Sequence, residues 1–189
     1  TGIMDQLCIT SARHGHGTLI DCRTLEVTHV PIPTDIKIVV RFIAHRTLVG
    51  SAYSDRVAEC ATAESLIGPL RDASLADVAT IADSTIAARA KHVVSENARV
   101  RAFADALTSG DYVTAGKIMT DSHHSLAEDF AVSNDLMDAA VRDMNETPGV
   151  FGARMTGGGF GGCIVALCDP DAVIDGWHVQ PVAAAAHLS

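Results

Sequence analysis

Apolar positions form short runs near both ends of the chain and helix-like repeats between them. Short runs with many β-branched side chains are typical of strands. They occupy six ranges: 18–22, 25–32, 36–43, 150–155, 163–167 and 179–188. The first two are joined at Arg23-Thr24 and predict a hairpin.

Between these runs the apolar residues recur every three or four positions, which is the period of an amphipathic helix. The clearest repeat lies in 86–107. Shorter repeats predict four more helices, at 3–12, 52–67, 112–127 and 134–145. Gly68-Pro69 is a strong signal for the end of the helix at 52–67. The pattern of residues 77–84 is ambiguous and does not decide whether they form a helix.

Strands followed by helices and then strands predict an α+β fold, with helices packed on one face of an antiparallel sheet. The sequence contains no repeat or linker, so we expect residues 1–189 to form a single unit. The segment 169–176 between the last two strands is too short for a helix. The final sheet edge is therefore expected to be uncovered, which favours association between molecules.

A glycine-rich segment interrupts the C-terminal strands. Five of the seven residues from Thr156 to Gly162 are glycine: Gly157, Gly158, Gly159, Gly161 and Gly162. Such a loop lets backbone N–H groups approach an anion, because no Cβ stands in the way. A tight turn between two strands explains the same composition, and both interpretations stay open.

The glycine spacing also satisfies the dinucleotide-binding pattern Gly-x-Gly-x-x-Gly. That pattern requires a helix after the loop, whereas 163–167 is expected to be a strand. A strand on each side of the loop argues against a dinucleotide site. A Walker loop is excluded as well, because the chain contains no Gly-Lys-Ser/Thr.

Composition narrows the classes of function further. The net charge is −9 with no basic run, which argues against nucleic acid as a partner. Five cysteines without a Cys-x-x-Cys motif are typical of reduced thiols in the cytoplasm. The longest apolar runs are shorter than the ~20 residues of a membrane span, so we expect no membrane insertion.

Three positions could carry chemistry. Asp5 is predicted in the first turn of a helix, where a carboxylate either offsets the helix dipole or serves as a base. Tyr53 is an aromatic residue at a helix start, either half-buried or available to a ligand. His123-His124 are adjacent and would point ~100° apart on a helix, which favours a structural role over a metal site.

Several segments resemble one family. Residues 154–163, Gly-Ile-Met-Asp-Gln from Gly2, Ser-Ala-Tyr-Ser-Asp-Arg from Ser51 and Asp-Ser-His-His-Ser-Leu from Asp121 resemble the GHMP small-molecule kinases, in particular the galactokinases. The resemblance implies ATP- and Mg²⁺-dependent phosphorylation of the anomeric hydroxyl of galactose. It makes Asp5 the base, makes Gly2 and Tyr53 sugar contacts, and assigns phosphate support to the five loop glycines.

Two motifs of that family do not occur in this sequence: Gly-Arg-x-Asn-x-x-Gly-Glu-His, and the Pro-x-x-x-Gly-x-x-Ser-Ser-Ser/Ala loop that wraps the ATP phosphates. The resemblance therefore implies the C-terminal half of a kinase, with little activity on its own. Possible partners are a separate N-terminal half or a second copy at the uncovered face. Two alternatives stay open: a truncated, non-catalytic sugar- or partner-binding protein, and a related sugar-1-kinase.

Overall fold

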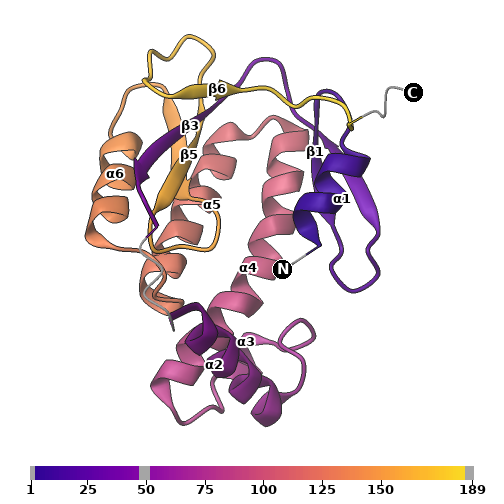
Figure 1. The fold of residues 1–189 in the computed structure, drawn as a ribbon, viewed down its shortest axis with the longest axis vertical. Helices are drawn as coiled ribbons and strands as arrows, with labels where there is room; N and C mark the ends of the chain where they lie inside the picture. The colour runs from indigo at the N-terminus through magenta and orange to yellow at the C-terminus, as the bar shows by residue number, and fades with distance from the viewer. Residues whose placement is uncertain (1–2, 47–51, 186–189) are drawn as a thin grey trace.

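The strands form two antiparallel sheets in the computed structural model, which describes residues 3–46 and 52–185 (Figure 1). One sheet is a hairpin of β1 (His16–Ile20) and β2 (Val27–Pro31). The other has the order β4-β5-β3-β6. Its strands are β3 (Lys37–Ala44), β4 (Val150–Met155), β5 (Gly162–Cys168) and β6 (Trp177–Val179). The α+β class and the antiparallel sheet are thus confirmed.

The helices begin and end at residues whose local chemistry favours those ends. They are α1 (Met4–Ser11), α2 (Ala52–Ile67), α3 (Leu75–Val78), α4 (Ser84–Ser109), α5 (Tyr112–His124) and α6 (Asp135–Asn145). Asp83 and Asn134 cap the N-termini of α4 and α6 with side-chain oxygens, and Gly110 ends α4 with a φ of 75°. None of the described helices is long and apolar enough to cross a membrane.

Helices cover both faces of the four-stranded sheet, whereas the sequence predicted helices on one face. Alternate side chains of β5 point to opposite faces. Ile164 and Ala166 pack with residues of α6, while Leu167 packs with residues of α4 and α5. Figure 1 shows β3 and β5 between α6 and α5. The strands are apolar on both faces, so the alternation that would have exposed one face is absent.

The helix predicted at 112–127 changes character near its end. The α-helix stops at His124, and residues Ser125–Asp129 form one π-helical turn. Its wider spacing is visible in the hydrogen bond from the Phe130 N–H to the Ser125 carbonyl at 2.9 Å. Such turns often occur at functional positions.

The last predicted strand, 179–188, is wrong for residues 180–185, and residues 186–188 lie outside the described ranges. Only Trp177–Val179 pairs with β3. Within residues 181–185, the carbonyl of Pro181 accepts from the Gly15 N–H, and the N–H groups of Ala184 and Ala185 donate to carbonyls of Ala12 and Ile9. The apolar segment therefore packs along the N-terminal region instead of extending the sheet.

Candidate functional site

The glycine loop between β4 and β5 has an exposed half and a buried half. Thr156, Gly157 and Gly158 are exposed, whereas Gly159 and Gly161 are buried. Gly157 and Gly159 have φ values of 82° and 87°, which favour glycine because a side chain there would be strained. The five glycines are therefore not equivalent.

The conformation of the buried half is determined by close contacts with the backbone of neighbouring segments. A Cβ on Gly159 would lie 2.5 Å from the Val132 carbonyl oxygen, and one on Gly161 would lie 2.8 Å from that of His45. The Phe160 N–H donates to the Val132 carbonyl at 2.7 Å. The tight-turn interpretation accounts for this half of the loop.

The exposed half faces a cation. A Cβ on Gly157 would lie 2.5 Å from Nη2 of Arg46, and one on Gly158 would lie 3.7 Å from Nη1. Backbone N–H groups without side chains, next to a guanidinium, are the elements of an anion-binding site. This half of the loop suits phosphate oxygens, and the cofactor role of the five glycines remains a prediction.

Tyr53 lies in the first turn of α2, and 61% of it is exposed. It lines a groove of about 910 Å³ between the β1–β2 hairpin, α2 and α4. In the same turn, Arg56 Nη1 donates to the Phe130 carbonyl at 3.1 Å. Because Val132 holds the glycine loop, the segment 130–132 connects the turn that carries Tyr53 with the loop.

Asp5 is exposed in the first turn of α1. This helix packs against β1, and in Figure 1 it lies on the opposite side of α4 from β5. The described part of the chain therefore does not place Asp5 beside the glycine loop. Gly2 lies outside the described residues. The roles predicted for Asp5, Gly2 and Tyr53 remain predictions.

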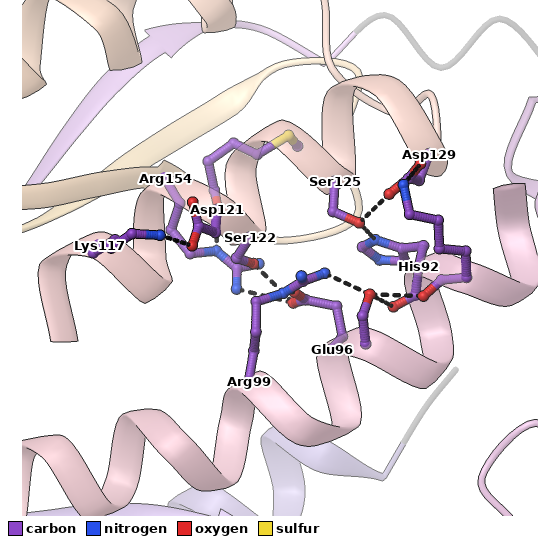
Figure 2. Close-up of polar contacts among 12 residues, drawn as sticks. His92, Glu96, Arg99, Lys117, Asp121, Ser122, Ser125, Asp129 and Arg154 are labelled. Atoms are coloured by element: carbon purple, nitrogen blue, oxygen red, sulfur yellow. Dashed lines mark hydrogen bonds and ion pairs between the residues drawn. The ribbon is translucent and has the colours of Figure 1, made fainter. Parts of the chain in front are cut away.

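A partly buried ionic network joins α4, α5 and β4, and the sequence did not predict it (Figure 2). Glu96 of α4 accepts from Ser122 Oγ at 2.8 Å, pairs with Arg154 at 3.4 Å and also pairs with Arg99. Burial alone would raise the pKa of Glu96, but the hydrogen bonds from Arg99 and Ser122 and the charge of Arg154 outweigh it and lower this pKa. Glu96 is thus an anion that holds two arginines.

A second chain of contacts continues the network toward the π-helical turn. Nδ1 of His92 lies 3.0 Å from Ser125 Oγ, and Ser125 donates to Asp129 at 2.9 Å. The His92 ring stacks on Phe130 with centroids 4.4 Å apart. In the sequence these residues appear only as polar side chains within predicted helices. Such a pattern does not show which side chains contact one another.

His123 and His124 face different surroundings, as their helical spacing predicted. His123 is buried and His124 is exposed. Within the described ranges no group of three or more His, Cys, Asp or Glu side chains could hold a metal ion.

We expect the free energy of unfolding to fall as the pH falls from 6.5 toward 4. Burial lowers the pKa of His92 to about 4, and burial also lowers the pKa of His123. The unfolded chain takes up these protons near pH 6.5, before the folded chain does. The neutral imidazoles thus stabilise the fold above pH 6.5, and that stability is lost at lower pH.

Urea denaturation at pH 7.5 and 4.5 would measure this loss, which we put at about 2–3 kcal/mol for His92. The variant His92→Asn keeps a polar group near the Nδ1 position and is the control. It should show a smaller pH dependence than the wild type. Equal pH dependence in both proteins would contradict the role of His92.

The chain matches known proteins over most of its length. The family model for the C-terminal domain of GHMP kinases matches residues 103–178. A galactokinase from Chloroflexus aggregans is 41% identical over 184 residues, which cover 91% of this chain and 47% of that protein. A galactokinase from Chloroflexus aurantiacus is also 41% identical, covering 95% and 50%. The chain spans about half the length of these curated relatives.

Solved structures agree with these matches. The crystal structure of Lactococcus lactis galactokinase complexed with galactose superimposes with a TM-score of 0.82 and 34% identity, covering 90% of this chain and 47% of that one. L. major mevalonate kinase in complex with R-mevalonate shares the fold, with a TM-score of 0.50 and 18% identity over 84% of this chain and 47% of that one. Residues 103–178 therefore resemble the C-terminal domain of GHMP kinases, and the chain as a whole is similar to about half of a galactokinase.

Proposed function

We propose that this chain acts as the C-terminal part of a galactokinase, which transfers the γ-phosphoryl group of ATP to the anomeric hydroxyl of galactose. The similarity to a galactokinase complexed with galactose carries the proposal. The 41% identity to curated galactokinases supports the same substrate and reaction.

In this proposal the chain provides a base, a sugar contact and part of the phosphate site. Asp5 accepts the proton of the attacking hydroxyl, and Gly2 and Tyr53 contact the sugar. A carboxylate suffices because phosphoryl transfer depends mainly on positioning and charge stabilisation. The five loop glycines lie near the phosphates, with Gly157 and Gly158 exposed toward Arg46.

ATP and Mg²⁺ supply the phosphoryl group and neutralise its developing charge. The exposed half of the glycine loop suits phosphate oxygens, but the family's loop that wraps the ATP phosphates does not occur in this sequence. We therefore propose that the 189 residues alone have little or no kinase activity, because positioning of the phosphates provides most of this catalysis. All five cysteines are unpaired, which supports a proposed location in the reducing cytoplasm.

Isothermal titration of the 189-residue chain with galactose and, separately, with Mg·ATP tests the proposal. We expect galactose to bind and Asp5→Asn to weaken binding by roughly tenfold or more, as loss of a charged hydrogen-bond partner does. The matched control is Asp135→Asn, because Asp135 is also exposed in the first turn of a helix. It should leave galactose binding unchanged.

Other outcomes would change the assignment. Equal loss of binding in both variants would remove Asp5 from the sugar site. Tighter binding of N-acetylgalactosamine than of galactose would favour a related sugar-1-kinase. ATP-dependent formation of galactose 1-phosphate by the purified chain would contradict its expected inactivity.

A further inference from the structure

The entrance of the glycine loop is attached to α5 through one buried hydrogen bond. Met155 is the last residue of β4, and its N–H donates to Nδ1 of His123 at 3.3 Å. His123 is 3% exposed, and Met155 is fully buried. The bond therefore lies in the interior, where an unpaired N–H is unfavourable.

The position of β4 explains why this N–H needs a partner outside the sheet. β4 is an edge strand that pairs only with β5 in the four-stranded sheet. The next N–H, that of Thr156, donates to the Cys163 carbonyl on the β5 side. Because successive N–H groups of a strand point to opposite sides, that of Met155 points away from β5, toward His123.

The hydrogen bond also determines which ring nitrogen of His123 carries the proton. A nitrogen that accepts from an N–H must be unprotonated, so the neutral ring carries its proton on Nε2. Nε2 lies 3.2 Å from Oδ1 of Asp138, although not in line for a hydrogen bond. Asp138 also accepts from Ser133 Oγ, one residue after Val132, which holds the middle of the loop.

We propose that His123 is a positioning residue for the glycine loop, which it holds in place through Nδ1 at the Met155 N–H. The loop is then attached to α5 through Met155 at its entrance and to Val132 through the Phe160 N–H near its centre. Asp138 lies beside the protonated nitrogen of the ring. If the proposed kinase function is right, His123 aligns Gly157 and Gly158 without touching the phosphates.

NMR of the histidine ring nitrogens in the wild-type chain tests the proton position directly. The expected result is Nδ1 of His123 without a proton and Nε2 with one. A proton on Nδ1 would overturn the proposal, because that nitrogen could then not accept from Met155. This measurement needs no variant and uses neither galactose nor ATP.

Two substitutions of His123 then distinguish the contribution of Nδ1 from that of Nε2. The side-chain oxygen of asparagine can replace Nδ1, and the amide of glutamine can replace Nε2. His123→Asn should leave hydrogen exchange at the Met155 amide within about threefold of the wild type, relative to amides of β5. His123→Gln should accelerate it by roughly tenfold or more.

A merely structural role for the buried ring would give a different pattern. Both variants would then accelerate exchange at Met155 and in β5 together, as global destabilisation does, and the proposal would fail. Galactose titration of the same variants keeps this result apart from the proposed function. Unchanged exchange at Met155 in His123→Gln would overturn the positioning role, whatever happens to galactose binding. Accelerated exchange with unchanged galactose binding would support the positioning role and would concern only the proposed function.

Discussion

Replacing Gly116 by alanine should prevent folding or lower the free energy of unfolding by more than about 4 kcal/mol. A Cβ on Gly116 would lie 2.0 Å from the Phe151 carbonyl oxygen and 2.2 Å from its carbon. A Cβ on Gly152 would lie 1.9 Å from the Gly116 carbonyl oxygen. The backbones of α5 and β4 thus meet directly, and no flexible side chain can move to make room.

Urea denaturation followed by circular dichroism would measure the effect of Gly116→Ala. The control is Gly17→Ala in β1, where the nearest atom to a new Cβ is the flexible Ile32 Cδ1 at 3.4 Å. We expect the control to change the unfolding free energy by less than about 1 kcal/mol. Equal stability of the two variants would mean that α5 and β4 are farther apart than described.

Removing the charge of Glu96 should also cause a large loss of stability. Glu96→Gln should lower the unfolding free energy by about 3 kcal/mol, because Arg154 and Arg99 lose their shared anion in a partly buried site. Burial already lowers the pKa of Arg154, and Glu96 partly offsets this. Without Glu96 the Arg154 charge would be buried with less compensation.

The exposed pair Lys117–Asp121 is the matched control, since its atoms lie 2.7 Å apart and the Lys117 side chain is 73% exposed. Lys117→Gln also removes one charge from an ion pair, but water screens it, so we expect a change below about 0.5 kcal/mol. Chemical denaturation of both variants at pH 7 would measure the difference. Similar small losses in both would show that the Glu96 network contributes no more than a surface pair.

Most element boundaries could be predicted from the sequence. The end of α2 at Ile67 and the extent of β4 from Val150 to Met155 match the predictions. Both depend on local signals: a Gly-Pro stop follows α2, and a Pro-Gly turn precedes β4. The strand predicted after the glycine loop, which argued against a dinucleotide site, is confirmed as β5. It too was predicted from a local signal, the short apolar run at 163–167.

The predicted site residues have a different status. The resemblance assigned roles to Asp5, Gly2, Tyr53 and the loop glycines from the identity of short motifs. A motif specifies residue types but not the distances between segments. The structure separates α1 from the glycine loop and divides the loop into an exposed and a buried half, and neither feature follows from the letters alone.

By itself, the sequence determined the class of fold, the order of most elements and the similarity to GHMP kinases. Only the tertiary structure decided that helices cover both sheet faces, that Gly116 meets Gly152, that Glu96 pairs with Arg154 and that His123 holds Met155. The physical reason is the separation along the chain of the residues that interact. Periodicity and turn residues report interactions within a few positions along the chain, whereas these contacts join residues more than 30 positions apart and exist only after the elements have packed.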